Sequence, residues 1–363
     1  MKLSLTLLST AALLAIIAYM STRPARPPTN NFSYLSQSPQ ASIVTTPEST
    51  LTNLPEKKVL SGGIQVFQTF NNCGPAALSM ALSHFGISRS QQELGMALRP
   101  YQVPGGNNDD KSVVLSELAD KASEYGFITF HRPAGDIETL KGIIAQDMPV
   151  ITRTLLDSSS DIGHYRVVKG YDDTNQQLLQ DDSLQGANLW YSYNDFMDLW
   201  EAYNFEYLVL VPKEKLEIAK SILGKSFDET HAWEKAVVYA SHKLAQNPDD
   251  TIAQFNLSVA YYHLGDFNKA TLHFENVEAK LPFRTLWYQI EPVLAYYQIG
   301  DYNRVLSLTE DILNNHNRAF SELYHLRALI YEKQGNDEAA TLERENILRY
   351  NIHYFENSPL NSS

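Results

Sequence analysis

The chain contains a single cysteine, Cys73, and the residues around it favour a reactive thiol. Pro75 suits the first turn of a helix, where its missing N–H leaves no bond unmade. Apolar residues then recur with a helical period, at Leu78, Ala81, Leu82 and Phe85. Cys73 therefore lies at a predicted helix N-terminus, where aligned peptide dipoles and N–H groups lower the pKa of a thiol. The alternative is an inert, buried cysteine.

A thiolate nucleophile needs a general base, and His164 begins the segment HYRVVKGYDDTNQQLLQDD. This pattern predicts a strand, a turn at DDTN and a returning strand. A turn centred near Asp173 would bring His164 opposite Asp182 at the open end of the hairpin. A neighbouring carboxylate fixes the imidazole tautomer and stabilises the imidazolium. The alternative is a histidine with a structural role.

These segments resemble a known family. QTFNNCGPAALSMALSHFG is similar to the nucleophile motif of C39-like peptidases, papain-fold enzymes related to bacteriocin-leader processing domains. HYRVVKGYDD resembles the histidine motif of that family, and DDSLQG resembles the end of its last strand, with Ser183 in place of the usual proline. The resemblance implies an α+β papain-like cysteine peptidase domain over residues 61–213.

The resemblance also implies a role for each matching residue. Cys73 would be the nucleophile, His164 the general base and then the general acid, and Asp182 the residue that orients His164. Gln68 would donate a side-chain N–H to the oxyanion, together with a backbone N–H at Cys73. Asp181 is the less favoured acid. Adjacent side chains point to opposite faces of a strand, so only one of Asp181 and Asp182 can serve.

Such a site requires no metal or organic cofactor, and none is expected. The acidic segment GGNNDDK (105–111) lacks the regular ligand spacing of an EF-hand. One cysteine excludes an intramolecular disulfide framework and any CxxC-type zinc site. With 29 Lys plus Arg against 42 Asp plus Glu, the formal charge is −13, which disfavours a nucleic-acid partner.

The second half of the chain repeats itself. Gly265, Gly300 and Gly335 recur at intervals of 35 residues. A tyrosine lies four residues before each glycine, and a small or apolar residue lies five residues after it. Each unit predicts a helix, a glycine turn and a second helix. The period resembles the tetratricopeptide repeat (TPR), which implies an all-α TPR solenoid over residues 226–352 that binds a protein partner or serves as a scaffold.

The N-terminal residues predict a membrane-associated segment and a tether. Residues 3–20 are apolar and uncharged, which suggests an uncleaved anchor or a signal peptide over residues 1–22 and an exported protein. Residues 23–60 are rich in Pro, Ser, Thr and Asn, which predicts a disordered linker. The membrane is expected to be a partner of this segment only.

Three functions remain open at this stage. The leading one is an exported cysteine peptidase that hydrolyses peptide bonds in a peptide or protein substrate. The second is a catalytically silent papain-fold and TPR protein that binds peptides or acts as a scaffold. The third is a transpeptidase or amidase that uses the same catalytic residues and thioester intermediate.

Overall fold

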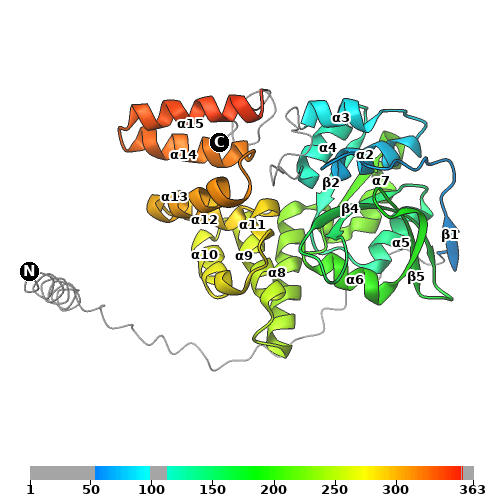
Figure 1. The fold of residues 1–363 in the computed structure, drawn as a ribbon. Helices are drawn as coiled ribbons and strands as arrows, with labels where there is room; N and C mark the ends of the chain where they lie inside the picture. The colour runs from blue at the N-terminus through cyan, green and yellow to red at the C-terminus, as the bar shows by residue number, and fades with distance from the viewer. Residues whose placement is uncertain (1–53, 99–112, 353, 355–363) are drawn as a thin grey trace, which may run out of the picture. The chain divides into compact units, whose positions relative to one another are not determined.

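The structure is a computed structural model of the full chain, and it describes residues 54–98, 113–352 and 354 (Figure 1). The predicted anchor (1–22) and most of the predicted linker (23–60) lie outside these ranges. Within the described ranges, no helix combines the length and apolar character needed to cross a membrane.

The first part of the described chain combines one antiparallel sheet with helices. Its strands are β1 (Lys57–Val59), β2 (Ile128–Arg132), β3 (Val150–Leu155), β4 (Gly163–Asp172), β5 (Gln177–Asp182), β6 (Gly186–Ser192) and β7 (Tyr207–Val211). Its helices are α2 (Cys73–Ser83), α3 (Gln91–Leu98), α4 (Leu115–Ser123), α5 (Ile137–Ala145), α6 (Tyr193–Glu201) and α7 (Leu216–Leu223). The predicted α+β class is confirmed.

The strands run in the order β2-β7-β3-β4-β5-β6, and β1 pairs with β4 beyond the end of β3. All neighbouring pairs are antiparallel. The predicted strand–turn–strand after His164 is therefore present as β4 and β5, at the centre and near one side of the sheet.

Helices cover both faces of this sheet, because alternate residues of its inner strands are apolar on both sides. Helices α2, α3 and α4 pack on one face against Ile151, Val167 and Leu208. Helices α5, α6 and α7 pack on the other face against Val150 and Val209. Each face thus has its own apolar core, and β4 is packed between the two cores.

Both ends of this part differ from the predicted boundaries. Lys57–Val59, at the end of the predicted linker, pair with Asp172, Tyr171 and Gly170 of β4. At the other end, α7 lies beyond the predicted boundary at residue 213, yet its apolar face packs into the sheet core. The side chain of Arg132 also donates hydrogen bonds to the carbonyls of Ser226 (2.9 Å) and Phe227 (2.6 Å). The folded unit therefore extends at least from residue 57 to residue 227.

The second part is all α-helical. Its main helices are α8 (Glu229–Gln246), α9 (Thr251–His263), α10 (Phe267–Glu275), α11 (Thr285–Tyr288), α12 (Glu291–Gln298), α13 (Tyr302–Asp311), α14 (Ser321–Lys333) and α15 (Asp337–Tyr350). Short 3-10 segments at Lys213–Lys215, Gly224–Phe227 and Glu278–Lys280 and a π-helical turn at Ile312–His316 complete the elements. We call α8–α15 the helical array.

The repeated glycines close helical hairpins, as their spacing predicts. Gly265, Gly300 and Gly335 have φ values of 75°, 80° and 71°, in the left-handed region that glycine adopts without strain. They join α9 to α10, α12 to α13 and α14 to α15, and Figure 1 shows the last pair lying side by side. The next residue caps each second helix, since the side chains of Asp266, Asp301 and Asn336 accept hydrogen bonds from its first turn.

Polar contacts tie the helical array to the sheet part. The side-chain amide of Asn256 donates to the carbonyl of Glu201 (2.7 Å), and the carbonyl of Asn256 accepts from the side chain of Asn204 (3.1 Å). Asp161 forms an ion pair with Arg284 (2.7 Å). Asn204 and Asn256 are each 3% exposed, so their side-chain hydrogen bonds are shielded from solvent.

We expect Asn256→Ala to lower the free energy of unfolding by about 0.5–1.5 kcal/mol, because it removes one hydrogen bond to the carbonyl of Glu201, which keeps the backbone N–H of Asn204 as a donor (3.1 Å). Urea unfolding followed by tryptophan fluorescence measures this change. Asn268→Ala, at an exposed position of α10, is the matched control and should change stability by less than about 0.5 kcal/mol. Equal unfolding midpoints for the two variants would show that the contact contributes little.

Candidate active site

Cys73 is the first residue of α2, as predicted, and it is partly exposed. The first hydrogen bond of the helix runs from the N–H of Ala76 to the carbonyl of Asn72 (2.9 Å). The amides of Cys73 and Gly74 thus precede the bonded part of the helix, where N–H groups and the helix dipole stabilise negative charge. The thiol stands at the end of the helix that favours a thiolate.

Helix α2 packs on β4, the strand that carries His164. A methyl group added at Gly74 would lie 3.5 Å from the ring of Tyr165, the residue after His164. The start of α2 and the start of β4 are therefore in contact next to the two predicted catalytic residues.

His164 and Asp182 form a buried pair. The Nε2 atom of His164 lies 2.9 Å from Oδ1 of Asp182, and the two residues are 2% and 0% exposed. The same carboxylate oxygen accepts the backbone N–H groups of Leu184 (2.7 Å) and Gln185 (2.8 Å). Arg166, also fully buried, places Nε 3.1 Å from the other oxygen, Oδ2, as an ion pair.

These contacts decide the charge of Asp182. Burial by itself would raise the pKa of this carboxyl, because desolvation penalises the ionised form. The hydrogen bond from His164, the charges of His164 and Arg166 and the backbone N–H of Gln185 outweigh burial, so the pKa lies below its ordinary value. Asp182 is therefore an ionised acceptor that can hold the imidazole in one orientation.

The strand register differs from the one predicted. Arg166, and not His164, pairs with Asp182. The turn is centred between Thr174 and Asn175, which is later than Asp173, and the bulge between Val168 and Gly170 takes back one residue of the resulting shift. His164 and Arg166 are two residues apart and share a face of β4, so the imidazole reaches the carboxylate diagonally. The predicted contact is present although the predicted alignment was wrong by two residues.

Asp181 has a different set of partners. Its carboxylate accepts hydrogen bonds from the ammonium group of Lys169 and from the backbone N–H of Asn188 (2.9 Å). In the strand register, Asp181 pairs with Val167. It therefore belongs to the other face of the strand, away from the side chain of His164.

Gln68 is held by Ser183 through two hydrogen bonds. Its backbone N–H donates to the carbonyl of Ser183 (2.7 Å), and its side-chain Oε1 accepts the hydroxyl of Ser183 (2.8 Å). A second glutamine, Gln65, donates its side-chain amide to the carbonyl of Asp182 (2.7 Å). The segment before α2 is thus bound directly to the end of β5.

Two residues that contact Asp182, Arg166 and Gln65, were not among the predicted site residues. The sequence contains a signal for Arg166, because it lies two residues after His164 and so shares its face of the strand. It contains no local signal for Gln65, since its partner is 117 residues away.

His131, another histidine of the sheet part, lies elsewhere. It is on β2, and β7 and β3 separate β2 from β4 in the sheet. Its Nε2 atom lies 2.8 Å from Oε2 of Glu206, which is 4% exposed. His131 therefore belongs to a second buried pair and not to the cluster around Asp182.

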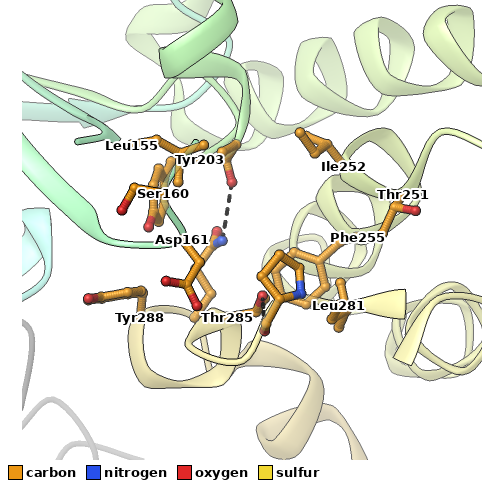
Figure 2. Close-up of a pocket in the computed structure, with 13 residues that line it drawn as sticks. Leu155, Ser160, Asp161, Tyr203, Thr251, Ile252, Phe255, Leu281, Thr285 and Tyr288 are labelled. Carbon is orange, nitrogen blue, oxygen red and sulfur yellow. Dashed lines mark hydrogen bonds between the residues drawn. The ribbon is translucent and has the colours of Figure 1, made fainter. Parts of the chain in front are cut away.

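A pocket lies beside the start of β4, where the sheet part meets the helical array (Figure 2). It has a volume of about 90 Å³. Its lining includes Leu155 and Tyr203 from the sheet part and Ile252, Phe255 and Tyr288 from the helical array. Tyr203 and Tyr288 also cover Gly163, the residue before His164.

Tyr203, in the wall of this pocket, is a buried phenol whose pKa lies above its ordinary value. Burial is the main cause of the rise, the charge of Arg153 opposes it, and a charge at Cys73 adds to it. Among the described residues, no group of three or more His, Cys, Asp or Glu side chains is arranged to hold a metal ion.

Comparison with known protein families gives one match in this part of the chain. Residues 30–208 match the model of the Peptidase_C39 like family. The match begins within the segment predicted as a linker. No curated protein matches the chain.

Several solved structures are similar to this part. One is a putative C39-like peptidase from Bacillus anthracis (19% identity, 43% of this chain and 98% of that one, TM-score 0.36). Another is the peptidase domain of Streptococcus ComA, a bifunctional ABC transporter of a quorum-sensing pathway (20% identity, 42% of this chain and 100% of that one, TM-score 0.34). A third is a double-glycine-motif protease from an AMS/PCAT transporter in complex with the leader peptide (16% identity, 43% of this chain and 99% of that one, TM-score 0.31).

The lowered pKa of Asp182 predicts a specific pH dependence of stability. In the unfolded chain an aspartate titrates near pH ~3.9, whereas in the folded chain Asp182 stays ionised to lower pH. Its stabilising contribution is therefore complete at neutral pH and is lost as the pH falls below about 4 through the folded pKa.

We expect the stability gap between the wild type and Asp182→Asn to be largest near neutral pH and to narrow as the pH falls below about 4. Urea unfolding between pH 7 and pH 3 measures the gap. Asp249→Asn is the control, because the side chain of Asp249 is 91% exposed, and its gap should stay small at every pH. A gap for Asp182→Asn that is constant or widens in acid would contradict the assignment.

Proposed function

We propose that this chain, with its C39-like peptidase domain over residues 30–208, is a cysteine peptidase that uses Cys73, His164, Asp182 and Gln68. The observation that supports this most directly is the buried hydrogen bond between His164 and an ionised Asp182. It lies on the strand covered by the helix that begins at Cys73.

In this proposal the thiolate of Cys73 is the nucleophile. Because Nε2 of His164 is bound to Asp182, Nδ1 is the ring nitrogen that takes the thiol proton. The thiolate and imidazolium then stabilise each other, with the helix N-terminus supporting the negative charge and Asp182 the positive one.

The reaction proceeds by acyl transfer. Sγ of Cys73 bonds to the peptide carbonyl carbon, and the carbonyl oxygen becomes an oxyanion. The C–N bond then breaks, and the imidazolium gives its proton to the leaving amine. A water molecule, deprotonated by His164, attacks the thioester, which releases the carboxylic acid and returns the proton to the thiolate–imidazole pair.

Gln68 serves the oxyanion. Its side-chain N–H and the backbone N–H of Cys73 would donate to the oxygen as it gains charge. The segment that carries Gln68 is bound to Ser183 and Asp182, so this donor is tied to the same structure that holds the catalytic acid.

The helical array is proposed to be a TPR solenoid that positions a peptide or protein substrate. The equal spacing of its three glycine turns supports the repeat assignment, and the pocket it shares with the sheet part supports contact with substrate near His164. We further propose that residues 1–22 anchor or export the protein, which places the peptidase outside the cytoplasm.

We expect rapid alkylation of Cys73 by iodoacetamide below pH ~7 in the wild type, because an imidazolium-paired thiol at a helix N-terminus stays ionised there. In the His164→Ala variant the pKa of the Cys73 thiol should rise toward its ordinary value of ~8.5, because only the helix N-terminus is left to stabilise the thiolate. The measurement is the alkylation rate against pH by mass spectrometry, with His242→Ala, an exposed histidine of α8, as the control. Equally slow alkylation below pH ~7 in all three proteins would refute the peptidase proposal and favour a silent binding protein.

The shared pocket predicts a preference for an apolar side chain of the substrate near the cleaved bond. A tryptic digest of cellular protein serves as the peptide library, and mass spectrometry identifies the new termini. Ile252→Trp fills the pocket and should abolish the apolar preference, while Val238→Trp, on the exposed face of α8, should preserve it. Identical cleavage profiles for wild type and Ile252→Trp would exclude the pocket from substrate recognition.

A further inference from the structure

Ser183 occupies an unusual position in this site. It follows Asp182 directly, it is 1% exposed, and its hydroxyl donates to Oε1 of Gln68 (2.8 Å). Its carbonyl accepts the backbone N–H of the same glutamine (2.7 Å). The backbone and the side chain of Gln68 are thus both hydrogen-bonded to Ser183.

The hydrogen bond from Ser183 holds the Gln68 carboxamide in one orientation. A carboxamide has an accepting oxygen and a donating NH₂ group on opposite sides, and rotation by about 180° exchanges them. An oxyanion is stabilised by the NH₂ group and repelled by the oxygen. In the structure the hydroxyl of Ser183 donates to Oε1 (2.8 Å), so Nε2 is directed away from Ser183.

The same turn also holds the catalytic acid. The N–H groups of Leu184 and Gln185 bind the carboxylate of Asp182, so the backbone on both sides of Ser183 is fixed.

We infer that Ser183 is a positioning residue that holds Gln68 in its oxyanion-donating orientation. This inference rests on the proposed function, since it needs Gln68 to face a developing oxyanion. Loss of the hydroxyl would let the carboxamide rotate, which weakens stabilisation of the oxyanion without changing the thiolate–imidazolium pair.

Two probes separate these effects. Iodoacetamide reports on the thiolate alone, because Sγ displaces iodide from a saturated carbon and no oxyanion forms. The aldehyde acetyl-Gly-glycinal reports on the oxyanion site, because Sγ adds to its carbonyl carbon and the oxygen gains charge before it is protonated to a thiohemiacetal.

We expect Ser183→Ala in the full-length chain to weaken acetyl-Gly-glycinal binding about tenfold, part of the 10²–10³-fold effect of removing an oxyanion donor. The alkylation rate at pH 6 should stay unchanged, and Ser183→Thr, which keeps the hydroxyl, should restore aldehyde binding. Ser258→Ala removes a buried serine hydroxyl bond in the helical array (2.6 Å) and controls for destabilisation.

A double-mutant cycle tests whether Ser183 acts on aldehyde binding through Gln68. In a Gln68→Ala background, Ser183→Ala should have almost no further effect on aldehyde binding, because the group it positions is gone. The same tenfold loss in that background, or unchanged binding in the single variant, would overturn the inference. Slow alkylation of the wild type below pH ~7 would instead refute the proposed function itself.

Discussion

The buried carboxylate of Asp182 is the charge on which the site depends. It is fully shielded from solvent, so it remains ionised only because His164, Arg166 and two backbone N–H groups surround it. These partners come from two segments of the chain: His164 and Arg166 from β4, and the two N–H groups from the turn after β5. Their convergence is possible because β4 and β5 are adjacent strands of one sheet, packed on both faces. By holding these strands in place, the apolar cores determine which charged and N–H groups lie next to the Asp182 carboxylate.

The turn after β5 contacts two segments that are far apart in the sequence. It binds the carboxylate of Asp182, and through Ser183 it binds Gln68, which lies five residues before Cys73. The segment that carries Gln68 continues into α2, so this one turn is bonded both to Asp182 and to the chain that leads to Cys73. In the proposed reaction, Asp182 would act through His164 and Ser183 through Gln68.

The helical array belongs to the same folded unit as the site. Its contacts with the sheet part are buried amide–carbonyl bonds and an ion pair beside the loop that leads into β4. Burying amides is costly unless they are hydrogen-bonded, and these are bonded to carbonyls of the opposite part. The array therefore adds a wall to the region near His164, and the shared pocket is its direct consequence.

The sequence by itself determined the features that depend on neighbouring residues. Pro75 and the apolar spacing after it placed Cys73 at a helix N-terminus, the DDTN turn predicted the β4–β5 hairpin, and the repeated glycines predicted the helical hairpins. It did not determine the register, because neither the bulge after Val168 nor the exact centre of the turn leaves a distinct local pattern. Only the tertiary structure decided that Arg166 and Gln65 approach Asp182, that Ser183 binds Gln68, and that α7 and β1 complete the sheet part. These contacts join residues far apart in the chain, and packing, not local preference, selects among the partners available.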